Sequence, residues 1–250
     1  MNLIFTAFLF LTTFSAQAFT LVGGGLSNLR GWNDKPVIYH LNPTNCRSDM
    51  AQIIQSSMDL WNSVSTSSLK LELGTNSAAT PAQVISAASA ETAVIVCDSS
   101  YGTTFPTADI NGSVGRGSAL VNQDYRIVRG YVVLNAEAAG AANINTKSFN
   151  FARIALAHEL GHSLGLGHSS DTAALMYYSI GQKDEFNITE DDINGINYLY
   201  PQDEFSGDQF MGGCGLVKGG PPAPPSGKMF ILTALMILSL WITLKQKNRV

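Results

Sequence analysis

Three histidines, one glutamate and a glycine hinge lie within eleven residues, in the string His-Glu-Leu-Gly-His-Ser-Leu-Gly-Leu-Gly-His that runs from His158 to His168. Residues four apart share one face of an α-helix at about 5 to 6 Å, so His158 and His162 can present ring nitrogens to one metal ion. A continuing helix would carry His168 away from that ion. Gly165 can end the helix, because glycine enters the left-handed conformation without a clash. Three neutral imidazoles leave one coordination position for water, which is typical of a catalytic zinc site.

The carboxylate of Glu159 adds a base to this set of ligands. It is expected to point toward the water in the fourth position and to accept its proton. A bare His-Glu-x-x-His string can arise by chance in an amphipathic helix, and a lone histidine is usually a satisfied core or surface residue. Here three of the four histidines of the chain occupy the ligand positions. The string therefore predicts one catalytic zinc ion held by His158, His162 and His168, with Glu159 as the general base.

The pattern of apolar residues around the string predicts the elements that must position it. Short alternating or β-branched runs indicate strands, and helical spacing indicates helices. Strands are expected at 36–41, 69–73, 92–97 and 130–135, and helices at 49–63, 150–164 and 188–200. Residues 111–117 are expected to form a glycine-rich loop, which matches no phosphate-binding pattern. This order of strands and helices predicts an α+β fold.

Two segments after the string carry a family resemblance. Ser169 follows the third histidine, and the segment Ala174-Leu175-Met176-Tyr177 comes soon after it. Together with the string and the helix at 188–200, they resemble the matrixins, the matrix-metalloproteinase group of the metzincin zinc proteases. The resemblance implies the metzincin fold over residues 31–201, a twisted mixed sheet with an active-site helix, a Met-turn and a C-terminal helix. Met176 matches the methionine of the Met-turn.

The resemblance also implies a function, a zinc endopeptidase that acts on protein or peptide substrates. An extended substrate would pair with an edge strand at Ser118–Val121 by β-augmentation. Two other functions stay open: a catalytically silent metzincin-like module that only binds, and a zinc hydrolase of a non-protein substrate.

The chain departs from animal matrixins in three ways. The only other histidine is His40, and one histidine cannot build the second zinc site of animal matrixins. No cysteine precedes Cys46 to form a cysteine switch. Residues 177–179 read Tyr-Tyr-Ser, where the specificity pocket of animal matrixins has Pro-x-Tyr.

Both ends of the chain predict export. Residues 1–18 are apolar and end in Ala-Gln-Ala, as a signal peptide does, although a retained anchor is the alternative. A short segment at 19–30 then leads into the domain. A linker rich in glycine and proline is expected at 202–227, followed at 228–250 by a transmembrane segment or sorting tail. The uncharged run before a basic end also resembles bacterial sorting signals, which fits a bacterial member of the family. We therefore expect a secreted or cell-envelope enzyme with its catalytic domain outside the cytoplasm. The tail could be retained as a membrane anchor or removed by a processing enzyme, and both alternatives stay open.

Composition and cysteine usage complete the prediction. A net charge of −4 without a basic excess gives no sign of a nucleic-acid partner. In an exported protein Cys46 and Cys97 can pair across the domain, which leaves Cys214 as the odd cysteine in the tail. Three aspartates are expected to face solvent from loops, and their spacing does not support a calcium site: Asp98, Asp109 and Asp124.

Overall fold

A five-stranded sheet forms the frame of the domain in the computed structural model, which describes residues 19–25, 28–181, 183 and 185–202. Its strand order is β2-β1-β3-β5-β4. Neighbouring strands run parallel except β4 and β5, which are antiparallel, so the sheet is mixed. The strands are β1 (Val37–Asn42), β2 (Leu71–Leu73), β3 (Ala93–Asp98), β4 (Gly115–Val121) and β5 (Ile127–Asn135). The α+β prediction is therefore confirmed.

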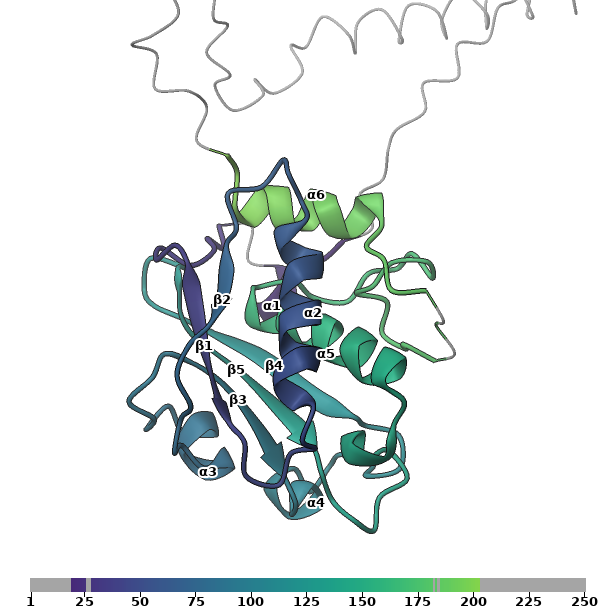
Figure 1. Cartoon of the computed structure of the whole chain (residues 1–250). Coiled ribbons are helices and arrows are strands. Elements are labelled where there is room, and N and C mark those ends of the chain that lie inside the picture. The colour runs from purple at the N-terminus through teal and green to yellow at the C-terminus, as the bar shows by residue number, and fades with distance from the viewer. Residues whose placement is uncertain (1–18, 26–27, 182, 184, 203–250) are drawn as a thin grey trace, which may run out of the picture. The chain divides into compact units, whose positions relative to one another are not determined.

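Helices lie on both faces of this sheet (Figure 1). The two long helices, α2 (Met50–Asn62) and α5 (Phe149–Ser163), pack against one another, and α5 also packs against β4 and β5. The third longer helix, α6 (Glu190–Leu199), closes the domain. Short helices lie between strands or next to them: α1 (Val22–Gly25) before β1, α3 (Pro81–Ile85) before β3, α4 (Tyr101–Thr104) before β4, and the 3-10 helix η1 (Ile144–Thr146) before α5.

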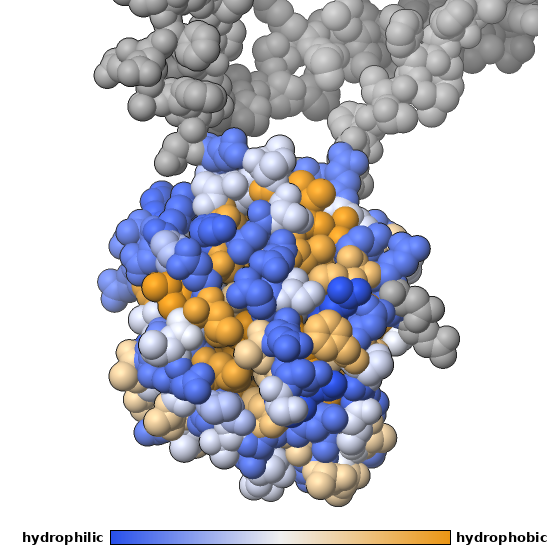
Figure 2. Space-filling view, viewed as in Figure 1, coloured by the Kyte–Doolittle hydropathy of each residue, from blue (hydrophilic) through white to orange (hydrophobic). Residues whose placement is uncertain are grey.

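The alternation of side chains along β3 divides the core into two layers. Ala93, Ile95 and Cys97 lie in the main core with α2 and α5, whereas Val94 and Val96 lie in a smaller cluster with α3 and α4. Because successive side chains of a strand point to opposite faces, a strand buried on both sides must be apolar at every position. On the outside of the domain, hydrophilic residues run between separate hydrophobic groups, so the apolar surface on the face shown is divided (Figure 2).

Helix α5, which carries the first part of the histidine string, is held on several sides by side chains that bond to its backbone. The indole Nε1 of Trp61 on α2 donates to the carbonyl of Ala157 at 2.9 Å. At the C-terminal end, Trp32 Nε1 donates to the Ser163 carbonyl at 3.2 Å, and the Tyr200 hydroxyl donates to the Leu164 carbonyl at 2.8 Å. The bonds from Trp32 and Tyr200 satisfy carbonyls that a helix end leaves without a partner. They also fix the position of the helix along its axis.

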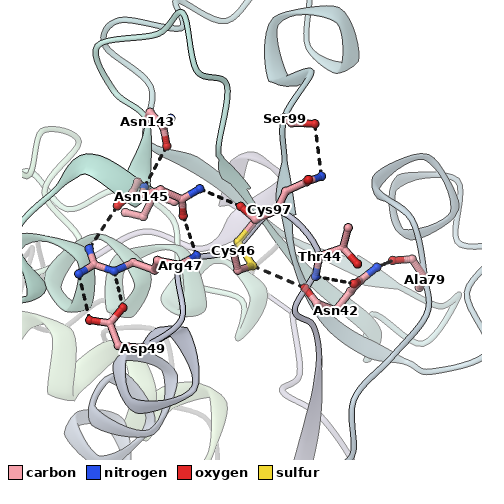
Figure 3. The surroundings of a disulfide bond; sticks show 12 residues. Asn42, Thr44, Cys46, Arg47, Asp49, Ala79, Cys97, Ser99, Asn143 and Asn145 are labelled. Carbon is pink, nitrogen blue, oxygen red and sulfur yellow. Dashed lines mark hydrogen bonds and ion pairs between the residues drawn. A yellow bond between two sulfur atoms is a disulfide. The ribbon is translucent and has the colours of Figure 1, made fainter.

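A disulfide bond joins Cys46, in the loop before α2, to Cys97 near the end of β3 (Figure 3). Arg47 extends this connection, since its backbone N–H donates to Asn145 Oδ1 at 2.9 Å and its Nη1 donates to the Lys147 carbonyl at 2.6 Å. The end of β3, the start of α2 and the approach to α5 are thus tied together.

Several predictions about single elements need correction. Residues 115–117, predicted as loop, begin β4, and β5 begins at Ile127, earlier than the predicted 130–135. Asp98, predicted to face solvent from a loop, is the last residue of β3 and is 5% exposed. One of its carboxylate oxygens accepts the N–H of Ser100 at 2.9 Å. Asp109 and Asp124 are exposed, as predicted.

The two chain ends carry predictions of a different kind. The signal peptide at 1–18 and the tail at 228–250 lie outside the described residues, as do Cys214 and nearly all of the linker at 202–227. Among the residues that the structure describes, no helix is long and apolar enough to cross a membrane.

Candidate active site

Helix α5 brings His158 and His162 onto one face, with ring centroids 4.8 Å apart. Nδ1 of His158 lies 2.8 Å from the Leu175 carbonyl, and Nδ1 of His162 lies 2.8 Å from the Leu166 carbonyl. Because a carbonyl only accepts, Nδ1 carries the proton in each ring, and the lone pair is on Nε2. Both rings are therefore set in the tautomer that binds a metal through Nε2.

The chain turns at Gly165, as the sequence predicts. Helix α5 ends at Ser163, and Gly165 has a φ of +107°. Its N–H donates to the His162 carbonyl at 3.1 Å, and the N–H of Leu166 donates to the Gly161 carbonyl at 2.9 Å. This pair of bonds is the Schellman motif, which ends helices and reverses the chain. The reversal brings His168 back toward the two helical histidines.

An N-terminal segment that the sequence did not predict to have a role holds this turn in place. The N–H of Gly167 donates to the Thr20 carbonyl at 2.7 Å, and the N–H of Val22 donates to the Gly165 carbonyl at 3.0 Å. The Thr20 hydroxyl also donates to the carbonyl of His168 at 2.7 Å. The position of His168 therefore depends on residues nearly 150 positions earlier in the chain.

The three imidazoles converge on one point. Nε2 of His162 lies 3.2 Å from Nε2 of His168, and the ligand atoms of the three histidines all lie within 4.8 Å of one another. Two nitrogens that bind tetrahedral zinc at 2.0 to 2.1 Å are about 3.3 Å apart. The donor set and its spacing therefore fit a zinc ion.

Burial keeps the two helical histidines in the form that binds metal. His158 is buried and His162 is partly buried, and burial lowers the pKa of each from 6.5 to about 4. Both rings are therefore neutral at pH 7. His168 is exposed, so the third nitrogen lies at the open side of the cluster.

Glu159 points away from the core and toward strand β4. Its Oε2 accepts the N–H of Gly117 at 2.5 Å, and its side chain is 7% exposed. Burial raises the pKa of the Glu159 carboxyl, which makes it a better proton acceptor once it is ionised. A Cβ at position 117 would overlap the Glu159 backbone carbonyl, so only glycine allows this approach. The sequence placed Gly117 in a loop and gave no sign of this contact.

A turn beneath the histidines contains Met176, which is 2% exposed. It lies directly against α5, because a Cβ at Gly161 would overlap the Met176 sulfur. The carboxylate of Asp192 on α6 accepts the N–H of Leu175 at 2.8 Å and that of Met176 at 2.9 Å. Since the Leu175 carbonyl is the partner of His158, Asp192 positions this ligand through the turn. The sequence predicted Met176, but it assigned no role to Asp192 within the helix expected at 188–200.

The family model of the matrixins matches residues 31–201. The chain belongs to the matrixin family. The mixed sheet, α5, the turn at Met176 and α6 are the parts that the matrixin resemblance implies.

Three relatives of this matrixin show how local the sequence similarity is. Matrilysin from Homo sapiens is 56% identical over 48 residues, which are 18% of this chain and 18% of matrilysin. Interstitial collagenase from Sus scrofa is 47% identical over 60 residues, or 24% of this chain and 13% of the collagenase. Metalloendoproteinase 1 from Glycine max is 50% identical over 56 residues, or 22% and 18%. The chain thus spans less than a fifth of the length of each relative.

A cleft of about 670 Å³ opens above the histidines of this matrixin. Its lining includes residues 115–118 of β4, residues 178–181 and Phe151. Strand β4 is the edge strand of the sheet and includes the predicted Ser118–Val121. The loop before it is held by Asn135, whose Nδ2 donates to the carbonyls of Ile110 at 3.1 Å and Ser113 at 2.9 Å. A free strand edge and a metal-binding cluster therefore border one cleft.

Proposed function

We propose that this matrixin is an exported, zinc-dependent endopeptidase in which Glu159 is the general base. One observation carries the proposal: the Nε2 atoms of three histidines, a buried carboxylate and an unpaired strand edge meet in one cleft. His158, His162 and His168 would hold one zinc ion. When bound, the ion polarises the carbonyl of the peptide bond and lowers the pKa of water.

Glu159 would move the proton in this reaction. Oε2 is fixed by the N–H of Gly117, which holds the carboxylate at the floor of the cleft. From there it can take a proton from the attacking water and give it to the nitrogen of the leaving amine. Burial raises the pKa of this carboxyl, which makes the ionised carboxylate a stronger base for the first of these transfers.

Strand β4 would hold the substrate. The Val114 carbonyl accepts the N–H of Asn135 on β5, so the backbone groups of Val114 point toward β5. In an antiparallel pair this direction alternates along the strand, so every second residue, starting with the one after Val114, turns its N–H away from β5 and toward the cleft. Gly117 is one of these residues, because its N–H bonds to Glu159. An extended peptide can add to this edge through main-chain hydrogen bonds, with side-chain pockets choosing the sequence. Tyr178, which is 67% exposed, also lines the cleft and would contact those side chains.

The domain boundaries and the location of the enzyme belong to the same proposal. Matrixins are generally extracellular, and a leader at 1–18 would export the catalytic domain at 31–201. The disulfide supports this, because disulfides persist in oxidising compartments. A linker at 202–227 and a hydrophobic tail at 228–250 would then tether the enzyme or serve as a signal that a processing enzyme removes.

The test compares the purified full-length protein with two matched variants. We expect the wild type to bind one zinc ion per chain and to cleave a dye-labelled unfolded protein. Glu159→Gln should keep the zinc ion and lose roughly 10²- to 10⁴-fold in kcat/KM, the typical contribution of a positioned acid or base. The control, Glu72→Gln, removes an exposed carboxylate of β2 and should be as active as the wild type.

Cleavage that survives Glu159→Gln would overturn the role of this residue. A protein that binds zinc but cleaves no peptide in a broad library would instead be a silent binding module or a hydrolase of another substrate. These two alternatives separate in a screen of non-protein esters and amides, in which only the hydrolase shows turnover that depends on Glu159.

A further inference from the structure

A second cavity, of about 420 Å³, lies apart from the catalytic cleft and shares no lining residue with it. Its wall contains three cationic side chains, those of Arg30, Lys35 and Arg126. Within the part of the chain that the structure describes, no carboxylate lines the cavity and none forms an ion pair with the three cations. The nearby acids in sequence, Asp34 and Asp124, are exposed and are not among the residues that line the cavity. The cavity is thus locally positive in a chain whose net charge is −4.

The backbone holds two of these cations next to one another. Arg30 and Arg126 form a parallel β-bridge, with the N–H of Arg30 donating to the Tyr125 carbonyl at 2.8 Å and the N–H of Ile127 donating to the Arg30 carbonyl at 3.1 Å. Paired residues on neighbouring strands point to the same face, so both guanidinium groups are directed to one side. Two positive charges that point to one face repel one another, and an anion bound between them would reduce this repulsion.

The remaining side chains of the wall leave donors available for such an anion. Lys35 Nζ donates to the Ser68 hydroxyl at 2.7 Å, which uses one of its three protons. Arg126 Nη1 makes only a long contact of 3.5 Å with the Gly31 carbonyl. Arginine and lysine side chains arranged in this way match the oxygens of a sulfate, phosphate or carboxylate group.

We propose that this cavity is a binding site for an oxyanion group, held by Arg30, Arg126 and Lys35. The site is independent of the proposed peptidase activity. The residues that line the cavity also support the active-site helix. Trp32 and Tyr200 donate to the carbonyls of Ser163 and Leu164 at the end of α5. Leu29 and Leu199 pack around Gly165. An anion bound there would stabilise the contacts that hold the turn leading to His168.

The test measures the melting temperature of the full-length protein against sodium sulfate and, separately, sodium acetate. Each series is balanced with sodium chloride to constant ionic strength, so that charge screening stays the same. The general stabilisation by sulfate, which is excluded from protein surfaces, does not saturate and is thereby distinguished from binding at a site. We expect a saturable rise in melting temperature, as for a ligand that binds only the folded state. The sulfate series reports tetrahedral oxyanions and the acetate series reports carboxylates, and a saturable response to either supports the site.

Three variants locate the response. Arg30→Gln removes an exposed charge for which the structure shows no side-chain bond, and Arg126→Gln removes its neighbour. Each should raise the apparent Kd about tenfold or more, since one charge-assisted hydrogen bond is lost. The control, Lys70→Gln, removes an exposed charge close by that does not line the cavity, and it should leave the Kd unchanged. The proposal fails if the wild type shows no saturable response, or if Lys70→Gln weakens binding as much as Arg30→Gln.

Discussion

The two halves of the histidine cluster are held by different kinds of structure. His158, Glu159 and His162 lie on one buried helix, and their relative positions follow from its pitch. His168 lies on the chain after the Schellman turn, and this half depends on contacts from the remote segment at Thr20. One half is thus set by local geometry and the other by tertiary structure. We expect changes to the two halves to have separable effects.

The largest effect is expected from Asp192→Asn, which weakens the turn whose Leu175 carbonyl bonds His158, a tertiary contact made to the helical half. The Asp192 carboxylate is 1% exposed and accepts the N–H groups of Leu175, Met176 and Thr189. An amide turns an NH₂ group toward at least one of these donors and leaves it unsatisfied. We expect the free energy of unfolding to fall by about 4 kcal/mol, because several buried bonds to a charged acceptor are lost. Urea denaturation of the metal-free protein measures this loss.

A matched change on the same helix gives the control for Asp192. Glu190→Gln alters an exposed acidic residue in the same first turn, and we expect a loss of about 0.5 kcal/mol from the helix dipole. Equal losses for the two variants would mean that Asp192 acts through the dipole and not through the turn at Met176.

The next largest effect is a pH dependence that comes from the helical half. In the metal-free protein, burial lowers the pKa of His158 and His162 from 6.5 to about 4, so the unfolded chain binds more protons between these two values. Stability is then fully present above pH 6.5 and is lost as the pH falls toward 4. We expect the metal-free protein to be less stable at pH 5 than at pH 7 by about 3 kcal/mol. Urea denaturation at the two pH values tests this, and the double variant His158→Gln and His162→Gln should lose most of the difference.

The smallest effect is expected at Gly165, where the two halves join. Its φ of +107° strains any other residue, and a Cβ there would lie 2.9 Å from Ile127 Cδ1 and 3.0 Å from Leu199 Cδ1. We expect Gly165→Ala to reduce the free energy of unfolding by about 2 kcal/mol. Gly181→Ala is the control: Gly181 also has a positive φ, of +42°, but the nearest heavy atom to its Cβ is 3.6 Å away. A smaller loss of unfolding free energy for Gly181→Ala than for Gly165→Ala would separate the cost of the steric overlap from the cost of the positive φ. Thermal denaturation of both variants measures the two losses.

The same division explains what the sequence could predict. The spacing of His158, His162 and His168, and the stop at Gly165, are properties of a helix and its end, which a sequence displays directly. The contacts of Thr20, Gly117 and Asp192 join segments far apart in the chain, and no local pattern displays them. These three residues complete the candidate site in the structure, although no sequence pattern assigns them a role in it.

The fold shows the same limit in its smaller elements. The buried strands and long helices were predicted because their apolar patterns extend over a full strand or several helical turns. Helix α3 has five residues, too few to show a period, although the capping box between Thr80 and Gln83 was a signal that could have found it. Asp98 was predicted as exposed because a charged residue usually is, but the end of a strand covered on both faces buries it.

The bond between Cys46 and Cys97 has a consequence for how the protein is made. In a reducing cytosol both thiols would stay reduced, and the tie between β3 and the start of α2 would be missing. The proposed metal ligands are all nitrogen atoms, so no thiolate is shared between the metal centre and the crosslink. Oxidation and metal loading therefore draw on different side chains, and the maturing protein can complete them in either order.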